Sequence, residues 1–237
     1  MKRGVALSGD GIAGAAAVGV LTALQELGIP LDALSGCGSA ALPAVLYCAK
    51  KQENDCKACL DTAHRLMQKN PRFRTLRRGY RTLRQQLDRC EALDIQGLKI
   101  PCAVVQTAGG GKKSYIAAPL PAMDCPELSV SPDADLAELL YKGLRGRGKR
   151  QSDLRELSAR LTWPLMQMGV ERVLTVRALD PDASNQPMDA KRSNVLEILV
   201  SPNEARCAED WKKAGYQAVL SRQMEVYDWA FFAPACT

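Results

Sequence analysis

Two short runs of small residues hold the groups of this chain that could do chemistry. The first is Gly9-Asp10-Gly11-Ile12-Ala13-Gly14, and the second is Ser35-Gly36-Cys37-Gly38-Ser39. Each run lies between an apolar stretch and a segment that favours helix. A helix that starts directly after a strand presents free backbone N–H groups, which can hold a phosphate or a reaction oxyanion. A serine at the tip of such a turn has the placement of a nucleophile.

The first run also matches a dinucleotide-binding pattern, Gly9-x-Gly11-x-x-Gly14. Two features oppose that interpretation. Asp10 places a negative charge where a phosphate would lie. The second strand is followed by small residues rather than by the acidic residue that binds a ribose. A nucleotide-binding protein that uses the Gly9–Gly14 loop is kept as an alternative, beside the simpler interpretation that a tight turn needs glycine for its backbone.

These runs must be positioned by strands and helices, and the apolar pattern predicts where those lie. It predicts strands over 4–8 and 31–34, helices over 12–27 and 40–51, and a turn over 35–39. Such a succession predicts parallel strands with right-handed crossovers. The remaining predictions are helices over 53–95, 136–140 and 204–221, strands over 100–107, 114–118, 172–178 and 195–200, and a loop over 143–150. We expect one α/β domain over residues 1–237.

In this order, the segments resemble the patatin-like phospholipases, which are lipid acyl hydrolases that use a Ser–Asp dyad. That family has an oxyanion loop G-G-G-x-R/K-G after its first strand and the motif G-x-S-x-G after its second. The resemblance is carried by Gly4–Ala16, Gly19–Pro30, Leu98–Thr107, Trp163–Val176 and Lys213–Ala218. It implies a patatin-like three-layer α/β/α fold with a mostly parallel central sheet. It also implies that the oxyanion loop is formed by Gly9, Asp10, Gly11 and Gly14.

The position of the family's nucleophile is occupied by Gly38 when the second motif is matched without gaps. Ser39 follows one residue later, at the start of the predicted helix. A shift of one residue turns a helical side chain by about 100 degrees. We therefore expect the Ser39 hydroxyl to point away from the site.

The other parts of the machinery are altered as well. Asp10 replaces a loop glycine and opposes the charge that an oxyanion loop stabilises, and Ala13 stands where the family has Arg or Lys. The family's Asp-Gly-Gly is absent before Trp163-Pro164-Leu165, and Glu156 is the acid near its place. We interpret Glu156 as an exposed helix charge, because Leu157 and Ser158 replace the glycines of that turn.

The resemblance and these departures together predict a patatin-like protein that has lost its hydrolase activity and acts as a binding or scaffolding module. The alternative is a divergent serine esterase or phospholipase that acts on lipid esters. In that case Ser39 would be the nucleophile and Glu156 or Asp10 the base.

Histidine and cysteine offer little further chemistry, so no metal and no cofactor are expected. His64 is the single histidine, and we expect it on the surface of a helix. Cys56-x-x-Cys59 lacks the second pair that a zinc site requires. Cys37 has two interpretations, a reactive thiol whose pKa is lowered by a helix N-terminus or a small buried residue, and the second is preferred.

The composition limits the partners. Aromatic residues make up 5% of the chain, too few for a surface that stacks nucleic-acid bases, so no nucleic acid is expected. The net charge of +6 includes basic runs over 72–84 and 145–150. We interpret these runs as solvated surface, with a lipid or membrane surface as the second interpretation. Nine scattered cysteines, no recognisable leader and no long apolar run predict a cytoplasmic protein, with peripheral membrane attachment as an alternative.

Overall fold

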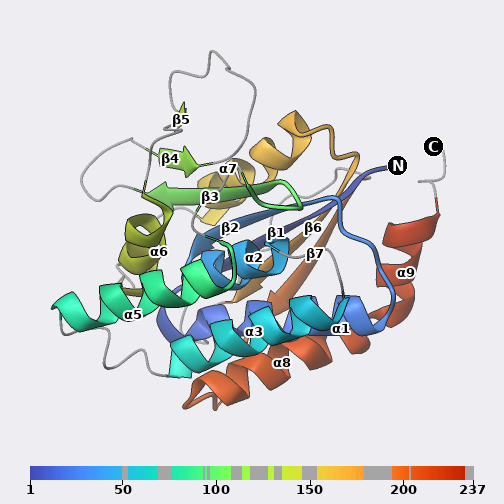
Figure 1. Ribbon diagram of the computed structural model, residues 1–237. Coiled ribbons are helices and arrows are strands. Elements are labelled where there is room, and N and C mark those ends of the chain that lie inside the picture. The colour runs from blue at the N-terminus through green and yellow to red at the C-terminus, as the bar shows by residue number, and fades with distance from the viewer. Residues whose placement is uncertain are drawn as a thin grey trace.

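A mixed sheet of seven strands forms the centre of the molecule in the computed structural model (Figure 1). The structure describes residues 1–49, 53–68, 76–92, 94, 97–107, 114–117, 128–130, 135–145, 154–178, 194–202 and 204–232. The strand order is β5-β4-β3-β2-β1-β6-β7. The strands are β1 (Arg3–Gly9), β2 (Ala33–Gly38), β3 (Cys102–Thr107), β4 (Ser114–Ala117), β5 (Leu128–Val130), β6 (Arg172–Ala178) and β7 (Val195–Val200). The five strands from β3 to β7 in space are parallel, whereas β4 runs antiparallel to β3.

Helices cover both faces of the sheet (Figure 1). The helices are α1 (Ala15–Glu26), α2 (Ala41–Cys48), α3 (Glu53–Gln68), α5 (Leu76–Arg89), α6 (Leu136–Arg145), α7 (Leu154–Gln167), α8 (Ala208–Leu220) and α9 (Gln223–Phe231), and a short 3-10 helix, η1 (Gly11–Gly14), precedes α1. Alternate strand residues enter two separate cores, as the two-residue period of a strand requires. Val5 and Leu7 of β1 join the core under α1 and α8, whereas Ala6 joins a smaller core with Leu161 and Leu165 of α7. The predicted α/β/α layering with a mostly parallel sheet is therefore confirmed.

The strands were the more accurate part of the sequence prediction. β6 and β7 have the predicted bounds, and the predicted return of 114–118 is the antiparallel strand β4. The strand predicted over 31–34 is wrong, because β2 occupies 33–38, so most of the predicted turn is strand. The helix predicted over 53–95 contains α3 and α5, the one over 136–140 extends to 145, and the one over 204–221 is α8, which begins at 208. The helices α7 and α9 and the short strand β5 were not predicted. Of the loop predicted over 143–150, residues 143–145 belong to α6 and the rest lie outside the described residues.

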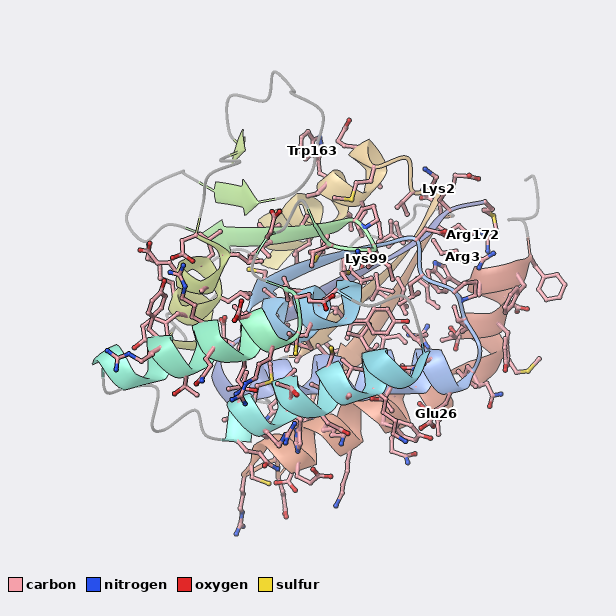
Figure 2. All side chains as sticks on the ribbon, viewed as in Figure 1. Lys2, Arg3, Glu26, Lys99, Trp163 and Arg172 are labelled. Carbon is pink, nitrogen blue, oxygen red and sulfur yellow. The ribbon has the colours of Figure 1, made fainter. Side chains whose placement is uncertain are left out.

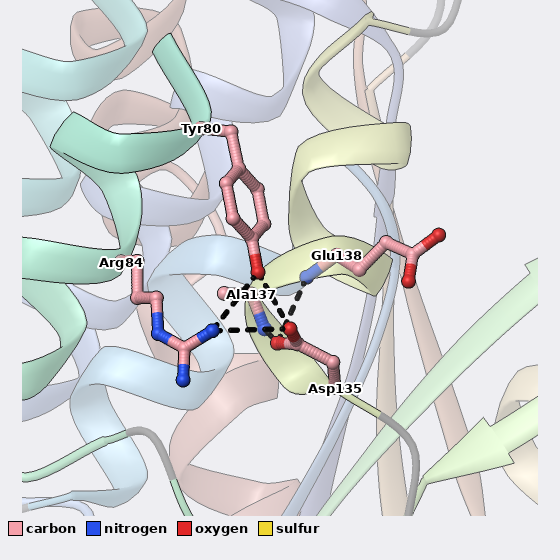
Figure 3. Close-up of polar contacts among 5 residues, drawn as sticks. All are labelled: Tyr80, Arg84, Asp135, Ala137 and Glu138. Carbon is pink, nitrogen blue, oxygen red and sulfur yellow. Dashed lines mark hydrogen bonds and ion pairs between the residues drawn. The ribbon is translucent and has the colours of Figure 1, made fainter. Parts of the chain in front are cut away.

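The carboxylate of Asp135 joins α5 to the start of α6 (Figure 3). Its Oδ1 accepts the backbone N–H groups of Ala137 at 2.9 Å and Glu138 at 3.3 Å. Its Oδ2 accepts the Tyr80 hydroxyl at 2.5 Å and lies 3.5 Å from Nη1 of Arg84. Burial raises the pKa of Asp135, but these hydrogen bonds and the charge of Arg84 outweigh it, so the net pKa is lowered.

Replacing Asp135 by alanine is expected to reduce the free energy of unfolding by about 1–2 kcal/mol at neutral pH, as for other helix caps. The pKa of Asp135 is lower in the folded than in the unfolded chain, where it has the ordinary value of an aspartate, about 3.9. Its contribution is therefore complete above that value and is lost as the pH falls through the folded pKa. Urea unfolding of both proteins at neutral and acid pH measures this loss, and a difference that keeps its size in acid would contradict it.

Candidate functional site

The two small-residue runs lie side by side at the carboxyl edge of the sheet. β1 and β2 are parallel, and their last residues, Gly9 and Gly38, are partners in the register. The chain passes from β1 to β2 on one side of β1 and from β6 to β7 on the other side, so the direction of the crossovers changes at β1. Open α/β sheets bind their ligands at this kind of position. The turns after β1 and β2 are therefore the candidate functional site.

The glycines of the first turn have two different physical causes. A Cβ on Gly9 would lie 3.0 Å from the backbone of Gly14, and a Cβ on Gly14 would lie 2.1 Å from Oγ of Ser39. Gly9 and Gly14 thus permit a close approach of two segments. Gly11 has φ of +56° with nothing within 4 Å of a Cβ position, so its glycine serves the left-handed backbone conformation alone.

Ser39 belongs to the packing between the two turns. Its side chain is fully buried, and its Oγ donates a hydrogen bond to the carbonyl oxygen of Gly9 at 2.9 Å. The same carbonyl accepts the backbone N–H of Ser39 at 2.9 Å and that of Ala40 at 3.3 Å. In hydrolases with a nucleophile on such a turn, the N–H of the next residue forms part of the oxyanion hole. Here that N–H, on Ser39, is directed to Gly9.

The residue at the tip of the second turn is Gly38, with φ of +64°. A Cβ on Gly38 would lie 2.4 Å from Oδ1 of Asp10 and 2.6 Å from the carbonyl oxygen of Gly9. The space in which a side chain at this position would start is therefore filled from the first turn. The two departures from the family pattern, Gly38 and Asp10, are neighbours in space.

The thiol of Cys37 is buried beside this turn, on the face of the sheet that α7 covers. Burial, followed by the negative charge of Asp10, raises the pKa of Cys37 to about 12, although a hydrogen bond from the backbone of Gly38 acts in the opposite direction. The interpretation of Cys37 as a reactive thiol of lowered pKa is therefore wrong. The helix N-terminus is outweighed by desolvation and by the neighbouring carboxylate.

We expect Cys37 to resist alkylation of the native protein. At mildly alkaline pH a thiol with this pKa has about a thousandfold less thiolate than an ordinary cysteine. Cys207 is exposed and provides the internal comparison. Peptide mapping after a short exposure to iodoacetamide should find Cys207 modified and Cys37 unmodified. Equal rates at the two positions would contradict this account of the turn.

The buried Arg177 forms an ion pair with the partly buried Glu197, which was not predicted from the sequence. Arg177 is the partner of Ser8 in the pairing of β6 with β1, one residue before the first turn. Glu197 lies on the neighbouring strand β7. A signal was present in the sequence, since Glu197 is the one charged residue of the otherwise apolar strand β7. A buried charge of this kind requires a partner, which β7 supplies.

The other candidate residues lie away from the two turns, or their side chains lie outside the described residues. Glu156 falls in α7, but the placement of its side chain lies outside the described residues. The prediction of a surface position for His64 is wrong, because it is buried between α3 and α8. Its Nε2 lies 2.8 Å from Oε2 of Glu209. Burial and the charge of Lys212 lower the pKa of His64, despite the opposing effect of Glu209.

Neither a metal cluster nor a membrane span occurs in the part of the chain that the structure describes. There, no group of three or more His, Cys, Asp or Glu side chains is arranged to hold a metal ion. None of the described helices combines the length and the hydropathy needed to cross a bilayer. Of the predicted basic runs, Arg84 is engaged with Asp135, whereas residues 72–75 and 146–150 lie outside the described residues.

Comparison with known proteins finds a short sequence match and a distant structural one. No protein-family model matches the chain. It is 44% identical over 48 residues to the neuropathy target esterase sws of Drosophila persimilis and of Drosophila melanogaster. This match covers 20% of the chain and only 3% of the length of those relatives. The crystal structure of the type III effector protein ExoU is similar with a TM-score of 0.48 and 13% identity, covering 94% of this chain and 53% of that one. The local match to the esterases supports the resemblance to the patatin-like family.

Proposed function

We propose that this chain is a patatin-like α/β protein without hydrolase activity, which acts as a binding or scaffolding module. The resemblance to an acyl hydrolase family covers the order of its segments, and the curated relatives that share a short segment with it are named as esterases. The proposal concerns this chain alone, because it spans so little of those relatives.

One observation carries the proposal, namely the contact between the two turns at Gly38. A nucleophile at this position needs a side chain that projects from the turn, and its Cβ would be 2.4 Å from Oδ1 of Asp10. Asp10 also brings a carboxylate to the place where negative charge would develop during acyl transfer. Electrostatic stabilisation of that charge is often the largest single contribution to such catalysis. The proposed loss therefore concerns the nucleophile and the oxyanion loop together.

Ser39 is the remaining hydroxyl that could attack, and its surroundings support a structural role. It is fully buried, and its Oγ already donates to the carbonyl oxygen of Gly9. A nucleophilic serine needs a general base within hydrogen-bond reach to take its proton. A backbone carbonyl cannot serve as that base at neutral pH. We accordingly assign Ser39 to the packing of the two turns.

Labelling with a fluorophosphonate probe and hydrolysis of p-nitrophenyl esters test this proposal. We expect the native protein to show no labelling and no hydrolysis above the level of its Ser39→Ala variant. Circular dichroism of the variant checks that the comparison is made on folded protein. Labelling that disappears in Ser39→Ala would overturn the proposal and would favour the divergent esterase.

A further inference from the structure

At the amino-terminal ends of the strands, opposite the two turns, two arginines lie next to each other without an acid between them. Arg3 of β1 and Arg172 of β6 are partners in the parallel register. Each is an even number of residues from a strand residue in the same core, Val5 and Leu174, so both side chains leave the same face of the sheet. Neighbouring strands are about 4.8 Å apart, which places two positive side chains side by side. Figure 2 shows Lys2, Arg3 and Arg172 at this end, where the N-terminus meets α9.

Arg172 contacts only uncharged acceptors among the described residues. Its guanidinium is buried, and Nη1 donates to the carbonyl oxygens of Asp228, at 2.8 Å, and of Trp229. These carbonyls belong to the last turn of α9, and that of Asp228 also accepts the backbone N–H of Phe232 at 3.1 Å. Arg172 thus holds α9 against the sheet, but its positive charge is not neutralised by a carboxylate.

Arg3 lies at the rim of the same place and is also unneutralised within the part of the chain that the structure describes. Its Nη1 donates to the carbonyl oxygen of Pro30 at 3.4 Å, and its guanidinium carbon lies 5.4 Å from the ring centroid of Phe231. The acids nearby accept backbone hydrogen bonds. Asp32 accepts the N–H of Arg3, and Glu171 accepts that of Lys2.

Two buried guanidinium nitrogens at this end lack an acceptor in the described structure. They are Nε of Arg3 and Nε of Arg172, and Arg172 is more than nine-tenths buried. Buried polar groups are almost always hydrogen-bonded, so a missing partner calls for explanation. Because both groups are donors that belong to cations, the group that would complete them is an anion, such as a phosphate.

Exposed apolar side chains occur on the two elements beside this basic site, the N-terminus and α9. The large hydrophobic side chains exposed here are Met1 at 48%, Met224 at 73%, Phe231 at 48% and Phe232 at 64%, and Leu199 of β7 is the one other such residue among those described. Met224 and Phe231 are seven residues apart and therefore lie on one side of α9. The opposite side of the helix is already buried through Val226, Trp229 and Ala230. The solvent-facing side of α9 also carries Asp228 and Glu225, of which Glu225 is paired with Arg222, and the exposed apolar pair Phe231 and Phe232 lies at the end of the helix.

We propose that this end of the molecule, formed by the start of β1, the start of β6 and the outer face of α9, binds the phosphate of an anionic lipid headgroup in a membrane surface. Arg3 and its neighbour Arg172 supply the donors. Phe231 and Phe232 enter the boundary between headgroups and acyl chains, as aromatic residues of peripheral proteins do. A free phosphate would satisfy the donors but would leave the apolar rim in water. The lipid matches both features, and this site is separate from the turns at the carboxyl edge.

Sedimentation with phosphatidylcholine vesicles, prepared with and without phosphatidic acid, tests the proposal. We expect binding only to the vesicles that contain phosphatidic acid. Arg3→Gln should weaken that binding about fivefold, since one basic residue near an anionic surface is worth about 1 kcal/mol. Replacing Phe231 and Phe232 together by serine should weaken it about tenfold or more, through loss of buried apolar area. Arg172 is left unchanged in these variants, because it also holds α9.

Arg81→Gln is the matched control, because Arg81 is an exposed cation in the predicted basic run on α5. It should bind the vesicles as the native protein does. Absence of vesicle binding by the native protein would overturn the proposal, and so would a loss in Arg81→Gln that Arg3→Gln does not share. Thermal unfolding with inorganic phosphate separates the two sources of the anion: stabilisation by phosphate without vesicle binding would reject the lipid. None of these readouts depends on ester hydrolysis.

Discussion

Gly38→Ser, the substitution that would place a serine at the family's nucleophile position, is expected to destabilise the protein by about 2–5 kcal/mol and to create no esterase. A residue other than glycine in the left-handed conformation costs about 1–2 kcal/mol. The remainder comes from overpacking, which costs about 1–3 kcal/mol in a tight site. The Cβ would start 2.4 Å from Oδ1 of Asp10 and 2.6 Å from the carbonyl oxygen of Gly9. Urea unfolding measures the first effect and p-nitrophenyl ester hydrolysis the second.

Gly11→Ser is the matched control for this experiment. Gly11 has φ of +56°, close to the +64° of Gly38, but nothing lies within 4 Å of its Cβ position. The control should therefore lose only the backbone part, about 1–2 kcal/mol. Losses of equal size in the two variants would show that the space beside Gly38 is open, and the proposed loss of the nucleophile would then have no steric basis.

A second substitution shows how much of the cost belongs to Asp10. Asp10→Gly restores the family's residue in the first turn and removes the nearest atom to the new Cβ, but the carbonyl of Gly9 stays in place. The double variant should therefore recover part of the stability that Gly38→Ser loses. Residues in contact commonly show coupling of about 0.5–3 kcal/mol in such a cycle. Strictly additive losses would mean that Asp10 and Gly38 do not share this space.

The parallel core of the fold could be predicted from the sequence, because its strands are marked by runs of apolar residues. The second strand was the exception. The small residues 35–38 are typical of a turn, yet they belong to β2. The cause is the helix that follows: a Cβ on Gly36 would lie 2.5 Å from Cα of Ala41 in α2. Small residues are required there by helix-to-strand packing, and a sequence pattern does not distinguish that requirement from a turn.

The position of the site could be predicted from the sequence, but the contacts that decide its chemistry could not. The two turns were found because glycine and serine are concentrated in them. The contact between Asp10 and Gly38 joins residues from different turns, and no spacing within either turn indicates it. His64 was misplaced for a related reason, since its burial depends on α8, which follows about 140 residues later in the chain. Contacts between distant segments decide both cases.

The close packing of α1 against α8 holds the helix that follows the first turn in place, and this packing depends on two glycines. A Cβ on Gly19 of α1 would lie 1.9 Å from the carbonyl oxygen of Lys212 and 2.7 Å from the backbone nitrogen of Tyr216. From the other side, a Cβ on Gly215 of α8 would lie 2.2 Å from the carbonyl oxygen of Ala16. The obstructing atoms are backbone atoms, which a side-chain rotation cannot move. The helices would have to separate to admit one methyl group.

Gly19→Ala should therefore destabilise the protein by about 3–5 kcal/mol, in the upper range for single substitutions. Helix propensity alone predicts the opposite sign, a gain of about 1 kcal/mol for glycine to alanine inside a helix. Thr22→Ala on the same helix is the control, and its effect should stay within about 0.5 kcal/mol, as is usual away from tight packing. Thermal and urea unfolding of the three proteins decide between packing and propensity. If Gly19→Ala proves as stable as the native protein, α1 and α8 do not meet at this glycine, and the first turn has a different support.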